Sequence, residues 1–446
     1  MNLVALPLNS DSIAEETYVG YSYSYPHKSA YGPLEPARSL RPLWQDERRD
    51  ALFLYWHIPF CEMRCGFCNL FARAGGDDRA VDAYLDALER QTHVMAAATA
   101  GDRLVSRMAV GGGTPTYLTA GQLERLFDLA EQYFAASPQQ VPTSVETSPK
   151  TALPDRLHVL RRRGVDRVSL GVQSFIDDET HAMGRPQSAQ EVRAALERLR
   201  AFPRLNIDLI YGGSTQTITS WIYSVRTALS YEPDELYLYP LYVRPGTGLG
   251  RRGSMRRSPA HALRLLYREA RDLLRAHGYE QVSMRCFQKE RETPAVGPVY
   301  CCQTDDMLGL GCGARSYTTR LHYSSRFGVE STEVHAILEA WTRQSETDFG
   351  RAAWGCVLSE DDRRRRFVLQ SLLTCAGLVE SELKRLFQVC VADVVPELAK
   401  WIADGLIERT AGRVRLTSLR LECSDWIGPA LYSPSNRAQF EKFALS

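Results

Sequence analysis

Apolar residues in the middle of the chain alternate between short continuous runs and helix-like spacing. Six runs are nearly continuously apolar and rich in β-formers: "LFLYWHI", "VSRMAVGG", "TSVET", "RVSLGVQ", "LNIDLIYG" and "ELYLYPLYV". Between most of them, apolar residues recur every three or four positions, as in residues 80–96, 120–134 and 260–278, which predicts amphipathic helices. Strands of this kind are buried on both faces. The pattern therefore predicts an α/β fold whose parallel sheet forms a complete or partial TIM-type barrel over residues 50–325.

Both ends of the chain differ from this pattern. Residues 1–49 hold several tyrosines among proline and glycine without helical spacing, which predicts an N-terminal extension. Residues 326–446 show helical segments followed by a short hairpin, with its turn expected at Ala411 and Gly412. This order resembles a small helical, winged-helix-like C-terminal module. Acidic residues interrupt the basic ones in it, so a packing or lid role is expected and nucleic-acid binding is not.

Composition narrows the class of protein. The 446 residues carry 54 basic and 53 acidic side chains, so no global charge favours nucleic acid or a membrane surface as a partner. No apolar run approaches the length of a membrane span, and the first residues lack the features of a signal peptide. Eleven cysteines are an odd number for a disulfide framework. A reducing, cytoplasmic location with a thiolate-ligated metal site is therefore expected.

Three cysteines stand together directly behind the first apolar run. Cys61, Cys65 and Cys68 are spaced C-x3-C-x2-C. A structural zinc site needs four ligands; His57 is available on paper, but it lies inside the predicted strand. A disulfide would leave one thiol over. The third alternative is a four-iron cluster held by three thiolates, with one iron left open for another ligand.

The residues around the cysteines carry a family resemblance. Phe67 stands immediately before the last cysteine, and "YWHIPF" immediately before the first. With these flanks, the motif resembles the radical S-adenosylmethionine (SAM) superfamily, in the branch of the oxygen-independent coproporphyrinogen III oxidases. The resemblance implies a radical SAM barrel with a [4Fe-4S] cluster on the three cysteines and SAM on the open iron. It further implies cleavage of SAM to a 5'-deoxyadenosyl radical, an electron donor such as flavodoxin or ferredoxin, and a small-molecule substrate.

The resemblance also implies which residues bind SAM. The motif "GGGTPT" follows the second predicted strand, where bare backbone N–H groups can approach a carboxylate; on its own it is equally typical of a tight turn. The other matching residues stand at the ends of later strands, where each alone could be an ordinary hydrogen-bonded barrel residue. One SAM is expected, and a second is suggested as a donor of a methyl or methylene group. Tyr55, Gly112 and Glu146 match positions of the first SAM, Gly113, Thr114, Gln173, Arg185 and Asp208 match positions of a second, and Phe67 and Gly111 belong to the same motifs.

Three departures from the family pattern bear on the reaction. The porphyrinogen oxidases carry a further cysteine two residues after the third ligand, where this chain has Leu70. The haem-binding motif of the chaperone branch is missing from "VYCCQTDDMLGLGCGARS", and the usual "GLPGQT" is "GGSTQT". We therefore expect a diverged enzyme, an oxidoreductase or a methyltransferase. The alternative is a non-catalytic haem-binding protein. Beyond the cofactor ligands, no catalytic residue is identified.

Two further features are each open to two interpretations. The late cysteines at 286, 301, 302 and 312 are either small buried apolar residues or ligands of an auxiliary cluster. The arginine-rich loop after the sixth strand, residues 244–259, is either a solvated run of charge or a clamp for a carboxylated or phosphorylated substrate.

Overall fold

The central strands of the sheet run parallel and contain all six predicted apolar runs. The structure is a computed structural model that describes residues 18, 24–47, 51–99, 104–253, 258–290 and 300–445. The parallel strands, in spatial order, are β12 (Asp306–Leu310), β2 (Leu52–Ile58), β5 (Val105–Gly112), β6 (Thr143–Thr147), β7 (Arg167–Gln173), β8 (Arg204–Tyr211) and β9 (Glu235–Pro240). Among the described residues, the two ends of the sheet do not pair with each other. The prediction of a partial parallel barrel is confirmed.

Antiparallel strands extend both edges of this sheet, which has 13 strands in all. Two of them, β1 and β15, come from outside the predicted 50–325 span, so the sheet takes in part of the N-terminal extension and of the C-terminal region. Strand β1 is mostly exposed and contains two prolines. An edge strand tolerates proline, but such a sequence shows no apolar run that would predict a strand. The added strands are β13 (Arg315–Tyr317), β14 (Leu321–Ser324), β15 (Arg351–Val357) and β1 (Gly32–Ser39) at one edge, and β11 (Cys286–Lys289) and β10 (Tyr279–Gln281) at the other.

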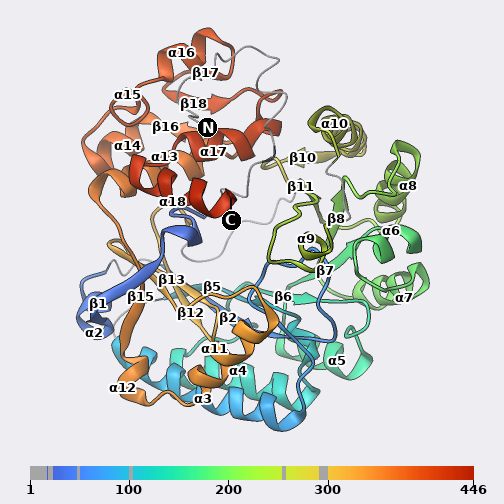
Figure 1. The fold of residues 1–446 in the computed structure, drawn as a ribbon, viewed down its shortest axis with the longest axis vertical. Coiled ribbons are helices and arrows are strands. Elements are labelled where there is room, and N and C mark those ends of the chain that lie inside the picture. The colour runs from blue at the N-terminus through green and yellow to red at the C-terminus, as the bar shows by residue number, and fades with distance from the viewer. Residues whose placement is uncertain are drawn as a thin grey trace.

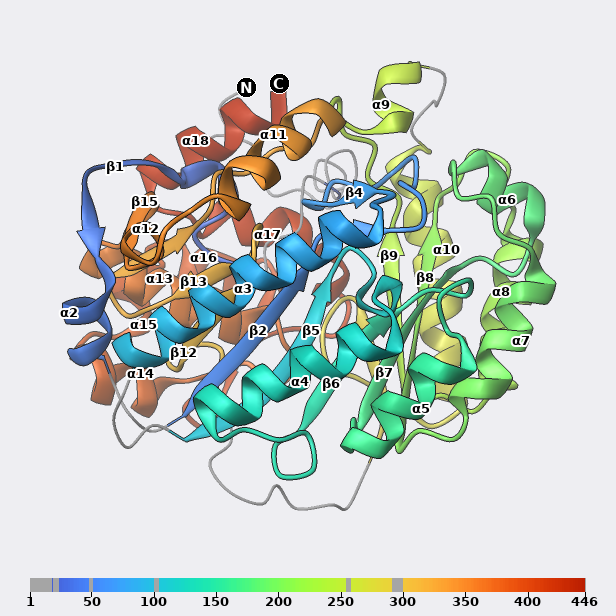
Figure 2. The ribbon, with the colours of Figure 1, turned by 90° about the horizontal axis from the view of Figure 1, so that it is seen from below.

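Amphipathic helices cover the outer face of the parallel strands. Figure 2 shows α3, α4 and α5 side by side in front of the strands, and the segments predicted as helices at 80–96, 120–134 and 260–278 coincide with α3, α4 and α10. Their apolar faces belong to one large hydrophobic core that also takes in the strands. The helices of this part are α2 (Leu40–Gln45), α3 (Asp78–Ala98), α4 (Ala120–Phe134), α5 (Pro154–Arg163), α6 (Asp177–Ala182), α7 (Ala189–Leu199), α8 (Ile218–Leu229), α9 (Gly248–Arg252), α10 (Ala260–Ala276), α11 (Ser331–Thr342) and α12 (Glu346–Phe349), with short 3-10 turns η1 (Lys28–Ala30) and η2 (Pro115–Tyr117).

The C-terminal region after β15 has a second hydrophobic core of its own and lies beside the sheet in Figure 1. Its three-stranded sheet is ordered β16-β18-β17. The predicted hairpin turn lies between β17 and β18, with both Ala411 and Gly412 at positive φ. The elements are α13 (Glu360–Leu372), β16 (Leu378–Val379), α14 (Glu380–Phe387), α15 (Val391–Val394), α16 (Leu398–Ala403), β17 (Ile407–Thr410), β18 (Arg413–Leu416), η3 (Leu421–Cys423), α17 (Ser424–Ala430) and α18 (Pro434–Leu445).

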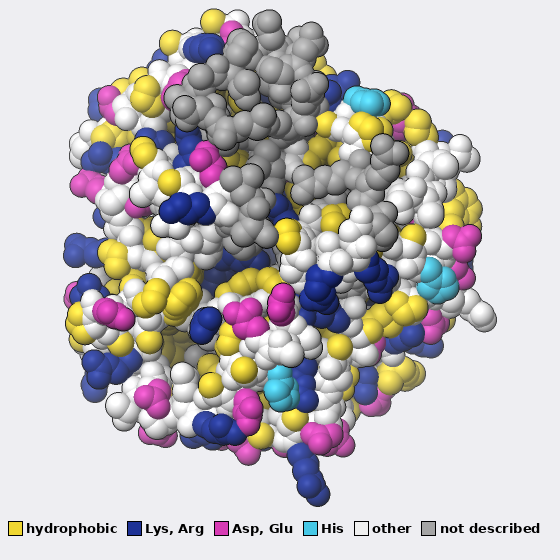
Figure 3. All heavy atoms as spheres, in the orientation of Figure 1, with side chains coloured by type: hydrophobic (Ala, Val, Ile, Leu, Met, Phe, Trp, Pro, Cys, Tyr) yellow, Lys and Arg dark blue, Asp and Glu magenta, His cyan; other side chains and the backbone are white. Residues whose placement is uncertain are grey.

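The surface and the helices agree with the balanced composition. On the face in Figure 3, the coloured Lys and Arg side chains are interspersed with Asp and Glu side chains. Within the described part of the chain, no helix is both long enough and apolar enough to cross a membrane.

Candidate active site

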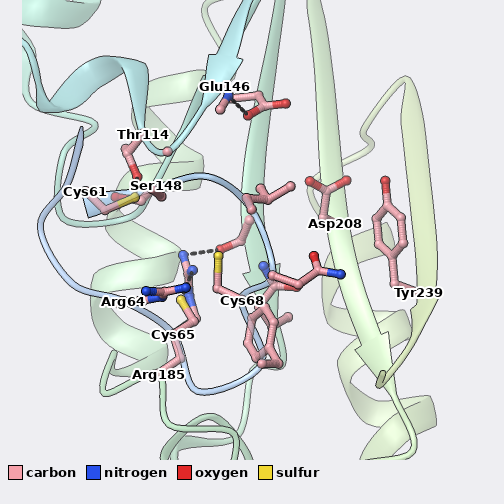
Figure 4. Close-up of a pocket in the computed structure, with 18 of the residues that line it drawn as sticks. Cys61, Arg64, Cys65, Cys68, Thr114, Glu146, Ser148, Arg185, Asp208 and Tyr239 are labelled. Atoms are coloured by element: carbon pink, nitrogen blue, oxygen red, sulfur yellow. Dashed lines mark hydrogen bonds between the residues drawn. The ribbon is translucent and has the colours of Figure 1, made fainter. Parts of the chain in front are cut away.

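A cavity of about 500 Å³ lies at the carboxyl ends of the parallel strands. This is the edge where ligands bind in parallel α/β sheets, and the volume is in the range of small-molecule sites. Its wall is built from the ends of β5 to β9, the loop that carries the three cysteines, and residues near the N-terminus. In Figure 4, Arg64, Cys65 and Arg185 lie together at the cysteine loop, whereas Asp208 and Tyr239 project from neighbouring strands.

The cysteine loop is held in place by backbone contacts. It begins at β3 (Phe60–Cys61), which pairs with β4 (Arg73–Ala74). In the middle of the loop, the N–H of Gly66 donates to the carbonyl of Gly184 at 3.1 Å, and the Gly66 carbonyl accepts from the N–H of Leu249 at 2.7 Å. A side chain at Gly66 would lie 2.7 Å from the Met183 carbonyl oxygen. Glycine is therefore required for the loop to pack this closely.

All three cysteines of the motif are free thiols that line the cavity. Burial raises the pKa of Cys61 to about 12 and also raises the pKa of Cys68, so their thiolate forms need a compensating positive charge such as that of iron. The described residues contain no group of three His, Cys, Asp or Glu side chains arranged to hold a single metal ion. His57 faces elsewhere, with its Nε2 atom 2.9 Å from the carbonyl oxygen of Phe71. The alternative of a zinc site that uses His57 therefore has no support.

The glycine turn after β5 lies directly against the first cysteine. Gly112 has a φ of 111°, and a side chain there would meet the His57 ring at 2.6 Å. A Cβ atom on Gly113 would lie 2.9 Å from the Cys61 sulfur, and the Thr114 hydroxyl donates to the same sulfur at 3.5 Å. The motif is both a tight turn and part of the cavity wall.

Two carboxylates border the cavity on neighbouring parts of the sheet. Glu146 on β6 accepts from the N–H of Gly112 at 3.1 Å, and Asp208 on β8 accepts from the Asn206 amide at 2.8 Å. The Glu146 side chain is open to the cavity, but the protein around the cavity keeps bulk water at a distance; this desolvation, and then the nearby charge of Asp208, raises the pKa of Glu146 to about 7. Burial likewise raises the pKa of Asp208. Such a pair is suited to accept hydrogen bonds from amino or hydroxyl groups of a ligand.

Arg185 and Gln173 meet at a bulge in β7. The pairing of β7 with β8 shifts between Gly171 and Gln173, and Gln173 has a positive φ of 67°, a conformation that costs energy for a residue other than glycine. Arg185 donates to the Gly171 carbonyl at 2.9 Å and to the Cys65 sulfur at 3.0 Å. The bulge thus directs Gln173 while it supplies the acceptor that orients Arg185.

The structure brings most of the predicted site residues to this one cavity. Tyr55 and Gly111 do not line it: Tyr55 lies 3.3 Å from the Nδ1 atom of His57 through its hydroxyl, and Gly111 lies behind the carboxylate of Glu146. The predicted residues that line the cavity are Cys61, Cys65, Phe67, Cys68, Gly112, Gly113, Thr114, Glu146, Gln173, Arg185 and Asp208.

Sequence reasoning missed several side chains in the wall. Tyr239 and Tyr242 line the cavity and could have been found, because they end the sixth apolar run. Lys28, Arg64 and Arg315 also line it. They do not stand at the carboxyl ends of the parallel strands, and no local sequence pattern distinguishes them from other basic residues.

Comparison with known proteins agrees with this geometry. The radical SAM superfamily profile matches residues 55–227, and the HemN C-terminal domain matches residues 358–419. The heme chaperone HemW of Bacillus subtilis is 31% identical over 369 residues, which cover 81% of this chain and 94% of that protein. The oxygen-independent coproporphyrinogen III oxidase of Escherichia coli is 30% identical over 388 residues, covering 82% of each chain. The solved structure of coproporphyrinogen III oxidase (HemN) from Escherichia coli, described as a radical SAM enzyme, superposes with a TM-score of 0.75 at 26% identity and covers 87% of this chain and 92% of that one.

Proposed function

Because this chain belongs to the radical SAM superfamily, in the branch of the coproporphyrinogen III oxidases and heme chaperones, we propose that it is an enzyme that cleaves SAM and acts on a small molecule. Membership implies a [4Fe-4S] cluster and SAM as cofactors. The residues present fit both. Three free thiols line one cavity, and the turn at Gly113 leaves no room for a side chain beside the Cys61 sulfur. That contact is the observation that carries the proposal.

A bound [4Fe-4S] cluster would supply one electron for the cleavage of a carbon–sulfur bond of SAM, which gives methionine and a 5'-deoxyadenosyl radical. Cys61, Cys65 and Cys68 would hold this cluster. The Arg185 guanidinium, 3.0 Å from the Cys65 sulfur, would stabilise its thiolate. Glu146 borders the cavity as a hydrogen-bond acceptor for the amino or ribose groups of SAM.

The finer part of the proposal is a second SAM that donates a methyl or methylene group. Its support is that Gly113, Thr114, Gln173, Arg185 and Asp208 line the same cavity as the residues assigned to the first SAM. Leu70, which stands where the oxidases have a cysteine, lines that cavity too and is 50% exposed. An apolar side chain there cannot perform the chemistry of a thiol, which favours a reaction other than simple porphyrinogen oxidation.

An anaerobic turnover assay tests the first step. Reconstituted protein is expected to bind about four irons per chain and to release 5'-deoxyadenosine when dithionite and SAM are added. Cys61→Ala, Cys65→Ala and Cys68→Ala should abolish both signals. Cys390→Ala is the matched control, because Cys390 is an exposed free thiol of the C-terminal region. One zinc ion retained per chain, without uptake of iron, would refute the proposal that the chain is a SAM-cleaving enzyme.

The proposal of a second SAM is tested by measuring how many SAM molecules one chain binds. Equilibrium dialysis with labelled SAM should give two molecules per chain, and Asp208→Ala should reduce this to one while 5'-deoxyadenosine is still formed. S-adenosylhomocysteine should appear beside 5'-deoxyadenosine once the substrate is present. A single bound SAM, or Arg185→Ala and Asp208→Ala variants that turn over normally, would end the two-SAM proposal and leave an oxidase-type reaction.

A haem-binding protein on the same scaffold is the second candidate, favoured by the 31% identity with a heme chaperone. Haem titration separates the two. Tight one-to-one haem binding without 5'-deoxyadenosine formation would select the chaperone, whereas 5'-deoxyadenosine formation without haem binding selects the enzyme.

The proposal includes the setting in which the enzyme works. All eleven cysteines are free thiols, which agrees with a reducing cytoplasm. Flavodoxin or ferredoxin is proposed as the electron donor, and replacement of dithionite by either reduced protein should sustain SAM cleavage. A failure of both donors would require a different reductant.

A further inference from the structure

Residues from the N-terminal extension form part of the cavity wall. Ser24, His27 and Lys28 line the cavity together with the cysteine loop. The Lys28 ammonium donates to the carbonyl of Asn69, next to the last cysteine of the motif, at 3.4 Å. The extension is therefore placed where it can contact a molecule bound beside the cluster.

This segment is anchored by the C-terminal region. The Tyr25 side chain is almost fully buried at 1% exposure, and its hydroxyl donates to Asp362 at 2.7 Å. The His27 ring packs edge-on against Phe440 with centroids 5.0 Å apart. Because these contacts fix the residues directly before Lys28, they hold the lysine at the cavity.

Three cations from distant parts of the chain line the cavity: Lys28, Arg64 and Arg315. Arg315 on β13 donates to the Ser24 hydroxyl at 3.0 Å. Arg64 donates one Nη2 hydrogen bond to the carbonyl of Val329, while its buried Nη1 atom has no hydrogen-bond partner. A buried guanidinium nitrogen without a partner is costly, and the charge of an anion in the cavity would lower that cost by stabilising the cation.

Arg315 and the two acids of the parallel strands lie on different parts of the sheet. The acids Glu146 and Asp208 stand on central strands, whereas Arg315 stands on β13, at the other side of β12 and β2. The remaining acid of the wall, Glu62, accepts from the Ser148 hydroxyl at 2.7 Å. Burial, and after it the charges of Arg315 and Arg244, lowers the pKa of Lys28 to about 7, so a fraction of Lys28 is the neutral amine near neutral pH.

We propose that Lys28, Arg64 and Arg315 form an anion subsite that binds a carboxylate or phosphate group of the substrate. The assignment of the anion to the substrate rests on the proposed function; the existence of the subsite does not. An ammonium and two guanidinium groups lining one cavity are the donors that proteins use for such groups. The subsite makes the N-terminal extension a determinant of substrate specificity.

Affinity labelling with pyridoxal 5'-phosphate tests the subsite. The aldehyde condenses with a neutral lysine amine, water leaves, and borohydride reduces the imine to a stable amine that peptide mass spectrometry locates. The chain has only six lysines, so the label is assigned without ambiguity. In the full, reconstituted protein, we expect the ratio of the rates with pyridoxal 5'-phosphate and with pyridoxal to be at least about tenfold higher at Lys28 than at exposed Lys150. Lys150 is the internal reference, because pyridoxal closes to a cyclic hemiacetal and therefore reacts more slowly than its phosphate with any lysine.

Variants and competitors complete the test. Arg315→Gln should remove most of the preference for the phosphorylated aldehyde at Lys28, taken as the ratio of its rates with the two aldehydes, in which a change in the pKa of Lys28 cancels. Arg409→Gln, at an exposed arginine paired with Glu380, should leave this ratio unchanged. Protection by tricarballylate indicates a carboxylate ligand, and protection by inorganic phosphate indicates a phosphate ligand.

Three outcomes would overturn the subsite: a rate ratio at Lys28 no higher than that at Lys150, no labelling of Lys28, or an unchanged ratio in Arg315→Gln. Protection by SAM but by neither competitor would assign the cations to SAM and overturn the assignment to substrate. Because labelling does not require SAM cleavage, a protein that shows the preference but forms no 5'-deoxyadenosine would refute the proposed enzyme and retain the subsite.

Discussion

Replacement of Gly113 by alanine should remove the cluster and leave the fold intact. The new methyl group would lie 2.9 Å from the Cys61 sulfur, 2.6 Å from the carbonyl oxygen of Phe60 and 3.0 Å from that of Ile58. Ordinary contacts of this kind lie at about 3.5–4.0 Å. Either the sulfur or the backbone must therefore retreat by at least ~0.5 Å.

The tightest of these contacts is with the backbone at Phe60. The N–H of Gly113 donates to the Ile58 carbonyl at 2.8 Å, and the N–H of Thr114 donates to the Phe60 carbonyl at 2.7 Å, so the turn cannot move away without weakening both hydrogen bonds. The backbone at Phe60 is therefore expected to shift and to carry the neighbouring Cys61 sulfur with it. A displacement of ~0.5 Å is a large fraction of a metal–sulfur bond of about 2.3 Å. The cost in folding free energy is that of overpacking, about 1–3 kcal/mol.

Iron content and thermal unfolding measure the two effects separately. Gly113→Ala should hold well below one iron per chain, against about four for the parent protein, and should unfold only modestly earlier. Gly121→Ala is the matched control, because its methyl group would meet nothing within 4 Å in helix α4 and should be neutral or stabilising by up to about 1 kcal/mol. Full iron uptake with normal SAM cleavage in Gly113→Ala would contradict the placement of Cys61 as a cluster ligand beside this turn.

Two further predictions concern stability and pH. Asp425 is fully buried and pairs with Arg285 at 2.5 Å, so Asp425→Ala should lower the free energy of unfolding, measured by urea titration, by about 3–5 kcal/mol. Glu380→Ala removes a surface ion pair and should lower it by less than about 1 kcal/mol. Similar losses in both variants would argue against a stabilising role of the buried pair. The pKa of Glu146 is raised to about 7 by desolvation and by Asp208, so its negative charge forms as pH rises through that value and SAM, which carries positive groups, should bind several-fold more tightly at pH 8 than at pH 6. Glu146→Gln should flatten this dependence in equilibrium binding, and a parent protein without pH dependence in this range would disprove the contact.

The parallel part of the sheet could be predicted from the sequence because each of its predicted strands carries a local signal, a short apolar run. Each of the six apolar runs is a strand, since a strand covered on both faces needs apolar residues at most of its positions. The edge strands β1 and β15 show no such apolar run. In β15 exposed and buried residues are mixed, and the prolines of β1 argue against a strand when read alone. Their pairing depends on residues more than three hundred positions apart.

The same distinction separates the two sides of the cavity. A carboxylate such as Asp208 is placed by its own strand, so strand order alone leads to it. Lys28 is placed by Tyr25, whose hydroxyl contacts Asp362 and Asn436, residues 337 and 411 positions away. Arg315 reaches the cavity only because the chain returns through β12 to the edge beside β2. Local periodicity holds no information on contacts of this range, so the place of Lys28 and Arg315 in the cavity wall becomes visible only when the chain is folded.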